Sequence, residues 1–483
     1  MRMFARRISG RPRSAATVLV VLGALLACVA PPAGAAPHWG PPAPPNPYLG
    51  PAGTSTMHGD AGSTDVTPLP GPGTGRHSLS AYPLVSACPT LLQGSDRLVV
   101  ALCTAVAGQV PTVHLIDPAA PAAPFGRSLA RFELAKGSLL GGVYAYLDND
   151  NRLVVVDGNR QLLRLGHSRD AGGAWRLTVD SRVDLSGSVP PGDNVTGLTP
   201  DWNGNVWFAT GGGVVGAVDR AGIAHARALP AGEEVQNSIS SSPAGTAVAS
   251  THALYQWSFR DGDLHLDWRR DYDRGGSRNP GQLSWGTGST PTYFGPSTGS
   301  DFVAIVDNAQ PRAQLRVFHI ESGDEVCTLP VLADPGGSEN SPVGVGNSVY
   351  VAGTYGYPYP VVPPGAGPAE PARAPFTGGM ARIDIDPIGC HEVWNNDVRS
   401  AAVPRLSTGD GHLYTVIREG PAVTTPLDGF SFVVIDPADG SLAHTSPLPG
   451  TAVNDTLQMS GLVTDTGDFW QGTVTGILRI RAE

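Results

Sequence analysis

The stretch GGVYAYLDNDNRLVVVDGNRQLLRL, from Gly141 to Leu165, decides the fold class. It contains short runs of β-branched, aromatic and leucine residues, broken by glycine, asparagine and aspartate. Such runs are typical of antiparallel strands, and asparagine and aspartate tolerate the positive φ values of tight hairpin turns. The stretch DWNGNVWFATGGGVVGAVDRAG, Asp201–Gly222, repeats this succession. Because strong helical periodicity is lacking after the N-terminal region, the sequence predicts an all-β protein.

The strand runs recur in a unit of about fifty residues, a period typical of propeller repeats. Asparagines at positions 194, 237, 340 and 454 stand at unit starts, and their separations of 43, 103 and 114 residues fit one, two and two units. Units of this length with about four strands are the signature of a β-propeller. We expect eight blades of four antiparallel strands, seven being the alternative, in units that begin near residues 88, 137, 187, 231, 278, 334, 399 and 451.

The two ends of the chain are expected to close the ring. The last unit, LQMSGLVTDTGDFWQGTVTGILRIRAE (Leu457–Glu483), contains only about three strand runs. The stretch RHSLSAYPL (Arg76–Leu84) can supply the missing outer strand, which would remove two open sheet edges. We therefore expect a single propeller domain over residues 77–483.

Blade-building motifs carry a resemblance to known families. The turn in VIDPADGSL (Val434–Leu442), and the aromatic Trp394 that follows such a turn in IDIDPIGCHEVW, resemble the quinoprotein alcohol dehydrogenase-like (PQQ-like) propellers. DWNGNVWFATGGG resembles the blades of streptogramin lyase-like propellers. The resemblance covers most of residues 88–483 and implies the fold. It also implies that Ca²⁺ and PQQ are candidate cofactors, although the chain has no vicinal cysteine pair of the kind many quinoprotein dehydrogenases carry.

The N-terminus has the order of a secretory signal. Five arginines within the first 13 residues precede the uncharged apolar run AATVLVVLGALLACVA (Ala15–Ala30), and a small-x-small cleavage site follows at Ala33–Ala35. The apolar run is shorter than the about 20 residues that a membrane span needs. We expect residues 1–35 to be a signal peptide and the protein to be secreted. Lipid anchoring through Cys28, in the loose lipobox LLAC, is the alternative.

Residues 36–76 are dominated by proline, glycine, alanine, serine and threonine. Such a composition is expected to bury little apolar surface, so we expect a disordered or extended leader. No other stretch is long and apolar enough to be a transmembrane segment.

The net charge and the cysteines limit which partners and which compartment the sequence allows. The formal net charge is −10, and loss of the arginine-rich signal makes it more negative, which disfavours nucleic acid as a partner. Four cysteines remain outside the signal, an even number that suggests two disulfides in an exported chain. We favour the pairs Cys88–Cys103 and Cys327–Cys390. We expect a monomer whose ligand outside the cell is a small molecule, a carbohydrate or a protein.

Polar residues at unit starts are candidates for a site at the channel mouth. The innermost strand of each blade faces the central channel, so Glu339, Asn340, Asn237 and Asn194 are expected to converge there. Carboxylate and amide oxygens suit Ca²⁺, which makes Glu339 and Asn340 the candidate metal ligands. The alternative is a purely structural role, in which these residues satisfy backbone groups and hold channel water.

Two long loops add aromatic candidates, since binding residues often stand on loops over a rigid scaffold. Asp271–Gly288 carries Trp285, and Thr354–Phe376 carries Tyr355, Tyr357 and Tyr359 among many prolines. Aromatic side chains on a proline-stiffened loop suit a hydrophobic, carbohydrate or protein ligand. A solvated loop without a ligand is the alternative.

These observations favour an exported propeller that binds a ligand or partner at the channel mouth and long loops. One alternative is an enzyme, either a PQQ/Ca²⁺-dependent oxidoreductase or a metal-assisted lyase or hydrolase. For the lyase, a pair of Glu339 with His391 or His412 is the candidate. Another alternative is a non-catalytic envelope scaffold. No catalytic residue is assigned, and whether the protein is an enzyme stays open.

Overall fold

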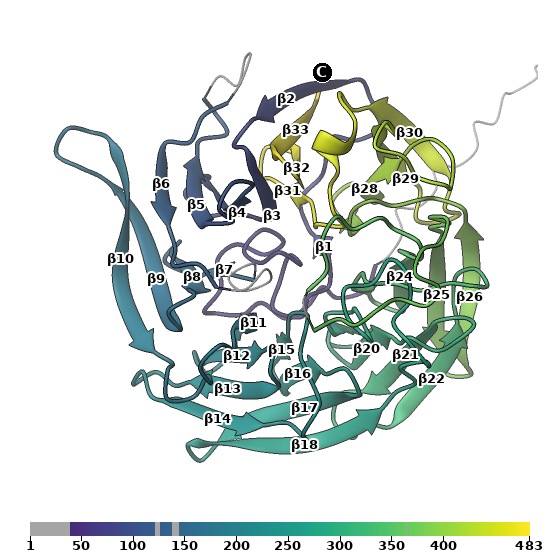
Figure 1. The fold of residues 1–483 in the computed structure, drawn as a ribbon, viewed down its shortest axis with the longest axis horizontal. Helices are drawn as coiled ribbons and strands as arrows, with labels where there is room; N and C mark the ends of the chain where they lie inside the picture. The colour runs from purple at the N-terminus through teal and green to yellow at the C-terminus, as the bar shows by residue number, and fades with distance from the viewer. Residues whose placement is uncertain (1–38, 121–125, 138–143, 364) are drawn as a thin grey trace, which may run out of the picture. The chain divides into compact units, whose positions relative to one another are not determined.

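Eight four-stranded antiparallel sheets surround a central channel in the computed structural model, which describes residues 39–120, 126–137, 144–363 and 365–483 (Figure 1). The prediction of an all-β, eight-bladed propeller is confirmed. Strands within each blade follow one another in the chain, from an innermost strand at the channel to an outermost strand at the rim. Blade 8 is the exception, because its outermost strand comes from the N-terminal part of the chain.

The strands of blades 1 to 4, with the innermost strand first, are β3 (Ser86–Gln93), β4 (Val99–Ala105), β5 (Pro111–Ile116) and β6 (Ala130–Glu133); β7 (Tyr146–Leu147), β8 (Leu153–Val156), β9 (Gln161–Arg169) and β10 (Trp175–Asp184); β11 (Val195–Pro200), β12 (Val206–Thr210), β13 (Val214–Val218) and β14 (Ala224–Ala228); and β15 (Ser240–Ser242), β16 (Gly245–Ala249), β17 (Ala253–Arg260) and β18 (Asp263–Asp271).

The strands of blades 5 to 8 are β19 (Thr292–Phe294), β20 (Phe302–Val306), β21 (Gln314–His319) and β22 (Glu325–Pro330); β23 (Val343–Val345), β24 (Ser348–Ala352), β25 (Met380–Asp386) and β26 (Gly389–Asn396); β27 (Arg405–Ser407), β28 (His412–Arg418), β29 (Phe430–Ile435) and β30 (Leu442–Pro447); and β31 (Leu462–Val463), β32 (Phe469–Thr473), β33 (Gly476–Ala482) and β2 (His77–Tyr82). A short 3₁₀ helix, η1 (Ala452–Asn454), precedes blade 8.

Aspartates close many of the hairpins. Asp148 Oδ1 accepts hydrogen bonds from the backbone N–H groups two and four residues later, at 3.0 and 2.9 Å. Asp201 and Asp219 make the same pair of bonds in blade 3. The side chain thereby satisfies turn N–H groups that would otherwise have no partner, which explains why strand runs in the sequence end at aspartate.

The hydrophobic core consists of layers between neighbouring blades. Eight clusters of buried apolar side chains occur among the described residues, and each joins two adjacent blades. The layer between blades 8 and 1 contains Trp470 stacked on Tyr82, with ring centroids 5.0 Å apart. Each blade therefore depends on both neighbours for burial of its two faces.

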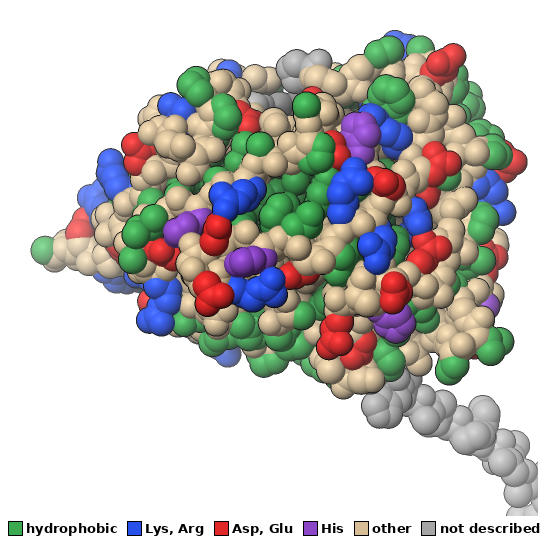
Figure 2. Space-filling view, turned by 90° about the horizontal axis from the view of Figure 1, so that it is seen from below, with side chains coloured by type: hydrophobic (Ala, Val, Ile, Leu, Met, Phe, Trp, Pro, Cys, Tyr) green, Lys and Arg blue, Asp and Glu red, His purple; other side chains and the backbone are tan. Residues whose placement is uncertain are grey.

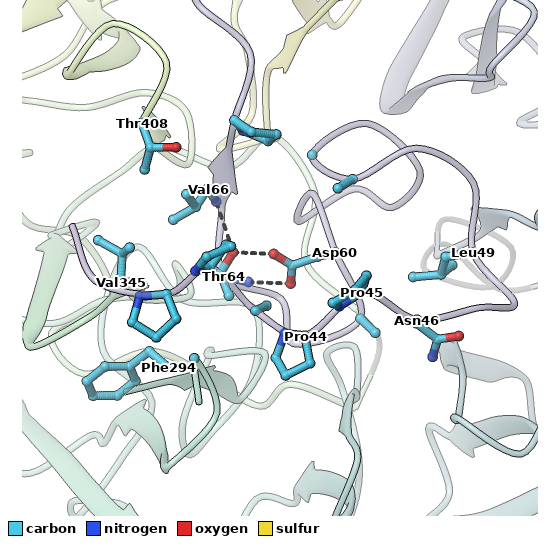
Figure 3. A pocket seen from close by; sticks show the side chains of 18 of the residues that line it. Pro44, Pro45, Asn46, Leu49, Asp60, Thr64, Val66, Phe294, Val345 and Thr408 are labelled. Atoms are coloured by element: carbon cyan, nitrogen blue, oxygen red, sulfur yellow. Dashed lines mark hydrogen bonds between the residues drawn. The ribbon is translucent and has the colours of Figure 1, made fainter. Parts of the chain in front are cut away.

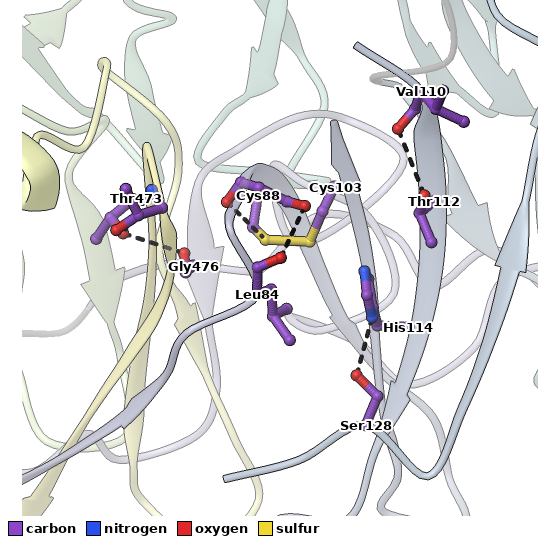
Figure 4. The surroundings of a disulfide bond; sticks show 11 residues. Leu84, Cys88, Cys103, Val110, Thr112, His114, Ser128, Thr473 and Gly476 are labelled. Atoms are coloured by element: carbon purple, nitrogen blue, oxygen red, sulfur yellow. Dashed lines mark hydrogen bonds between the residues drawn. A yellow bond between two sulfur atoms is a disulfide. The ribbon is translucent and has the colours of Figure 1, made fainter. Parts of the chain in front are cut away.

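The ring closes as the sequence predicts. Strand β2 pairs antiparallel with β33, from His77 opposite Ala482 to Tyr82 opposite Ile477. The two favoured cysteine pairs also lie at disulfide distance. Cys88–Cys103 joins β3 to β4 within blade 1 (Figure 4), and Cys327–Cys390 joins the outermost strands of blades 5 and 6. The second pair therefore links neighbouring blades at the rim.

A disordered leader was expected over residues 36–76, but the residues of this stretch that the structure describes, from residue 39 on, are packed against the blades. Residues 39–69, here called the channel segment, run through the middle of the ring (Figure 1) and include strand β1 (Val66–Thr67). Thr54, Thr64 and Asp65 are buried. The composition was misleading because small residues and prolines suit a narrow channel, where backbone groups rather than apolar side chains make the contacts. The predicted signal peptide, residues 1–35, lies outside the described residues.

The channel segment joins successive blades through its backbone carbonyls. Those of residues 61, 62, 64 and 65 accept hydrogen bonds from the innermost strands of blades 4, 5, 6 and 7, with N···O distances of 2.7, 2.9, 3.0 and 3.0 Å. The carbonyls of Thr54 and Ser55 accept from blades 1 and 2 in the same way. Strand β1 extends blade 7 inward by pairing parallel with β27. These bonds satisfy N–H groups on inner sheet edges that would otherwise lack a strand partner.

The outer surface mixes charges of both signs. Figure 2 shows basic and acidic side chains interspersed on the face it presents. Outer strands β14 and β18 contribute ion pairs of this kind, including Arg227 with Asp263 and His225 with Asp219. Among the described residues, no helix has the length and apolar character needed to cross a membrane.

Limited proteolysis distinguishes a channel segment from a leader. We expect chymotrypsin to cut the folded protein after Tyr48 and Leu49 roughly 100-fold more slowly than after Leu427, because cleavage in the channel requires local or global opening. Leu427 is 82% exposed in a loop of blade 7 and serves as the matched site, whereas Leu49 is 8% exposed. Mass spectrometry of early fragments gives the rates. Equal rates at Leu49 and Leu427 would contradict the packed segment.

Candidate functional site

A cavity of about 360 Å³ opens at the end of the channel where the innermost strands begin. We call it the strand-start cavity. The residue two positions before an innermost strand lines it in five blades: Tyr144, Thr290, Ser341, Val403 and Ser460. Met57 and His58 of the channel segment line it as well. The fold thus assembles this cavity from segments far apart in the sequence, which a rigid ring holds in place.

The segment before β23 is fixed by its own polar groups. Ser338 Oγ donates to the carbonyl of Ala352 at 2.7 Å and accepts from the backbone N–H of Asn340 at 3.0 Å. The backbone N–H of Glu339 donates to Thr354 Oγ1 at 2.8 Å. With its backbone groups bonded in this way, the segment holds the Glu339 side chain at the cavity without using the carboxyl for the fold.

The Glu339 carboxyl is buried and unpaired. The residue is 7% exposed, and neither carboxyl oxygen has a hydrogen-bond partner among the described residues. Burial raises the pKa of Glu339 to about 8; the Leu283 backbone, the Asn237 amide and the charge of Arg278 lie near enough to oppose this rise without reversing it. Neither Leu283 nor Asn237 reaches hydrogen-bond geometry with the carboxyl. Near neutral pH the group is therefore largely protonated.

Glycine at position 288 makes room for this carboxyl. A Cβ atom added at Gly288 would lie 2.5 Å from Glu339 Oε2 and 2.5 Å from Glu339 Cα. Any larger residue at position 288 would therefore force the Glu339 segment to move.

Two asparagines that the sequence predicted for the site line the same cavity. Asn237 Oδ1 accepts a hydrogen bond from the Tyr144 hydroxyl at 3.4 Å, while its Nδ2 has no partner among the described residues. Asn340 Nδ2 donates to Gln458 Oε1 at 2.9 Å, and Gln458 Nε2 donates to the carbonyl of Ser400 at 2.8 Å. Asn340 is thus held by a network across blades 6, 7 and 8, whereas Asn237 keeps a free donor.

Four other predicted residues do not line this cavity. Asn194 lies in the loop before β11, where its carbonyl accepts from the N–H of Gly211. Trp285 stacks beneath the Arg274 guanidinium at 4.0 Å and donates to the Arg274 carbonyl. Tyr355 is buried away from the cavity, and the buried Tyr357 hydroxyl bonds to Asp455. The structure thus does not place these four at this cavity, and Tyr359 is the tyrosine of the long loop that lines it.

The histidine at the cavity is one that the sequence did not single out. His391 is on the outermost strand of blade 6 and His412 pairs with Asp410, so neither lines the cavity with Glu339. His58 does, and its Nδ1 lies 2.8 Å from Asp65 Oδ2. Its Nε2 lies 3.4 Å from Thr290 Oγ1. The predicted pairings of Glu339 with His391 or His412 are not formed.

A buried arginine holds the channel segment next to His58. Arg405 Nη1 lies 3.6 Å from Asp65 Oδ1, and Nη2 donates to the carbonyls of Met57 and Gly461 at 2.5 and 3.0 Å. Burial lowers the pKa of Arg405, and the charges of Asp65 and Asp60 oppose that change. Arg405 thus links the floor of the cavity to blade 8.

A second cavity, of about 240 Å³, lies where innermost strands end (Figure 3). Prolines of the channel segment line it together with Phe294, Val345 and Thr408. Its carboxylate is Asp60, whose pKa burial raises to about 6. Both Asp60 oxygens have a partner in Thr64, at 2.5 Å from the hydroxyl and 3.3 Å from the backbone N–H. Asp60 therefore serves the fold of the channel segment, in contrast to Glu339.

The strand-start cavity does not fit the cofactors that the resemblance implies. PQQ is a tricarboxylate, yet no lysine or arginine is among the described residues that line the cavity. Ca²⁺ takes six to eight oxygen ligands, and Glu339 is the single carboxylate among the lining residues that the structure describes. The described residues also contain no group of three or more His, Cys, Asp or Glu side chains placed to hold a metal ion.

Comparisons with known proteins support the fold. No family model matches the chain. An uncharacterized protein of Archaeoglobus fulgidus is 33% identical over 149 residues, which is 29% of this chain and 29% of that protein. The chain thus matches less than a third of that relative's length.

Among solved structures, a europium-containing methanol dehydrogenase has 10% identity and a TM-score of 0.53, covering 88% of this chain and 98% of that chain. A virginiamycin B lyase from Staphylococcus aureus has 13% identity and a TM-score of 0.40, covering 68% and 94%. At 10% identity the likeness to the methanol dehydrogenase shows a shared fold alone. The class that the structure defines is therefore the eight-bladed β-propeller, and a quinoprotein function stays a prediction.

Substituting Glu339 tests the state of the buried carboxyl. Its pKa is near 8 in the folded protein and near 4.5 when unfolded, so the folded state retains a proton that the unfolded state releases between these values. The free energy of unfolding should therefore fall as pH rises from 4.5 to 8, by roughly 4 to 5 kcal/mol relative to Glu339→Gln, and level off above pH 8.

Chemical denaturation at pH 5 and pH 9 measures this difference. Glu321→Gln, at an exposed position in the blade 5 hairpin, is the matched control and should follow the wild-type profile. Parallel profiles for the wild type and Glu339→Gln would show that the carboxyl does not have the raised pKa.

Proposed function

We propose that this chain is an exported β-propeller that binds a small, largely apolar molecule in the strand-start cavity. The observation that carries the proposal is the Glu339 carboxyl, which is buried at the cavity with both oxygens unpaired. A buried polar group without a partner costs the fold about 1–3 kcal/mol or more. A site that tolerates this cost in a rigid segment is suited to a ligand that supplies the missing partner.

The cavity has the composition of a small-molecule site. Its volume of about 360 Å³ falls within the range of about 300–1,000 Å³ typical of ligand pockets. Leu283, Val403 and Met459 give it apolar walls, while Glu339 and Asn237 supply a few polar groups. Apolar walls provide burial energy, and a few unpaired polar atoms provide orientation.

Export is supported by the N-terminal sequence and by the cysteines. The arginine-rich start, the apolar run Ala15–Ala30 and the small-x-small site follow the order of a secretory signal. Both cysteine pairs at disulfide distance are compatible with an oxidising compartment.

An enzyme without a bound metal is the second candidate, and one observation favours it. His58 pairs with Asp65 through Nδ1 while Nε2 lies beside Thr290 at the cavity that also contains Glu339. A histidine fixed by a carboxylate and a protonated carboxyl in one cavity are groups suited to general acid–base catalysis. The propeller scaffold alone, with no ligand, is the remaining alternative and predicts an empty cavity.

Ligand-observed NMR with cyclohexanol as a neutral probe tests binding in the cavity. We expect saturation transfer to cyclohexanol, and Val361→Trp should weaken binding at least about tenfold because an indole at the rim obstructs the opening. Val361 lines the cavity and is 54% exposed, so the substitution should leave the fold intact. Val423→Trp, at a residue that is 71% exposed and does not line the cavity, is the matched control.

Two results would contradict the proposal. One is the absence of saturation transfer to cyclohexanol from the wild type. The other is transfer that Val361→Trp and Val423→Trp leave equally strong, since the probe would then bind elsewhere on the surface.

A further inference from the structure

Other buried carboxylates of this chain show what Glu339 lacks. Glu233 accepts hydrogen bonds from Tyr255 at 2.7 Å and Arg269 at 2.9 Å. Asp455 pairs with Arg418 at 2.9 Å, and Asp468 accepts from Arg479 Nε at 2.7 Å. Each of these acids is less than 9% exposed, as is Glu339. A cationic partner thus accompanies these three buried acids, whereas buried Asp307 is held by the backbone N–H groups of Ala309 and Gln314.

The chain does not supply such a partner to Glu339 among the described residues. Arg278 is the nearby cation, but its guanidinium donates to the carbonyls of Gln282 at 2.7 Å and Gly367 at 3.0 Å. Both oxygens of Glu339 consequently stay without a donor beside a cavity that can admit one. A cation supplied by a ligand would satisfy oxygens that the described residues leave without a donor.

The lining selects an organic cation over a metal ion. Leu283, Val403 and Met459 line the cavity with apolar surface, and Glu339 is the single carboxylate among its described lining residues, whereas Ca²⁺ takes six to eight oxygen ligands. An ammonium group on an apolar body needs only a few acceptors and gains from apolar burial. Tyr144 and Tyr359 add aromatic rings, whose faces attract an organic cation.

We propose that the ligand of the strand-start cavity is an organic cation, an alkyl- or arylammonium ion whose nitrogen pairs with the Glu339 carboxylate and whose apolar body lies against Leu283, Val403 and Met459. This inference rests on the proposed function and narrows it to a class of ligand. The unpaired Asn237 Nδ2, which lies near Glu339, is a donor available to the carboxylate once it is ionised.

Binding exchanges a proton for the ligand. The protonated carboxyl releases H⁺ to solvent and the ammonium ion takes its place, so charge is conserved and no bond of the ligand breaks. An amine that stays protonated over this pH range should therefore bind about tenfold more tightly for each unit by which the pH rises toward 8. Above pH 8 its affinity should level off. The other titratable or charged groups around the carboxyl are Arg278, His58, Tyr144 and Tyr359.

Calorimetry with cyclohexylammonium chloride and cyclohexanol, at pH 6, 7, 8 and 9, tests the inference. We expect the ammonium ion to bind at least about tenfold more tightly than cyclohexanol at pH 9, with about one proton released per ion bound at pH 6 to 7. Buffers of different ionisation enthalpy measure the proton release. Glu339→Gln should lose the preference for the ammonium ion, and its cooperative unfolding transition in chemical denaturation shows whether the variant is folded.

Glu339→Gln also separates the contribution of the carboxyl to the pH dependence of binding from that of His58, because any pH dependence that the variant retains belongs to other groups. A wild type that binds cyclohexanol without preferring cyclohexylammonium would overturn the inference and leave the proposed function standing. Failure of both probes would overturn both. Tighter binding of CaCl₂, in competition with cyclohexylammonium and lost in Glu339→Gln, would assign the site to a metal ion instead.

Discussion

The inner edges of the blades are the constraint on which this structure depends. Each innermost strand faces the channel with backbone groups that its own sheet leaves unpaired. The carbonyls of residues 61, 62, 64 and 65 satisfy four consecutive blades in turn, and β1 adds a fifth strand to blade 7. A ring with layers of apolar side chains between blades needs this inner support as well as the outer closure by β2. The N-terminal part of the chain therefore stabilises the ring at both its centre and its rim.

The same channel segment gives the strand-start cavity its floor. Arg405 and Asp65 hold Met57 and His58 at the base of the cavity, while segments before the innermost strands form its walls. Displacing the segment would remove part of the cavity lining and the hydrogen-bond partners of several blades together. Stability and the candidate site are therefore coupled through one stretch of backbone, which favours a preformed cavity over one that a moving loop completes.

The blades could be predicted from the sequence because their signals are local. Hairpins such as that of Asp148 are encoded within a few residues, and the fifty-residue period repeats them. The channel segment was not predicted because its partners lie up to 348 residues away and its composition resembles that of a solvated chain. Glu339 was recognisable as an acid beside the unit-start Asn340. Tyr144, His58 and Gln458 were not, because only closure of the ring brings them to the same cavity.

The two ends of the channel contain acids whose hydrogen bonding differs. Asp60 has both oxygens bonded to Thr64, so its burial is explained by the turn that it closes. Glu339 stands on a segment whose backbone is already bonded, and neither of its oxygens has a partner among the described residues. An acid needed for the fold would resemble Asp60 or the arginine-paired Asp468. The Glu339 carboxyl contributes no hydrogen bond to the described fold, and the ligand recognition proposed for the cavity would give this carboxyl a role.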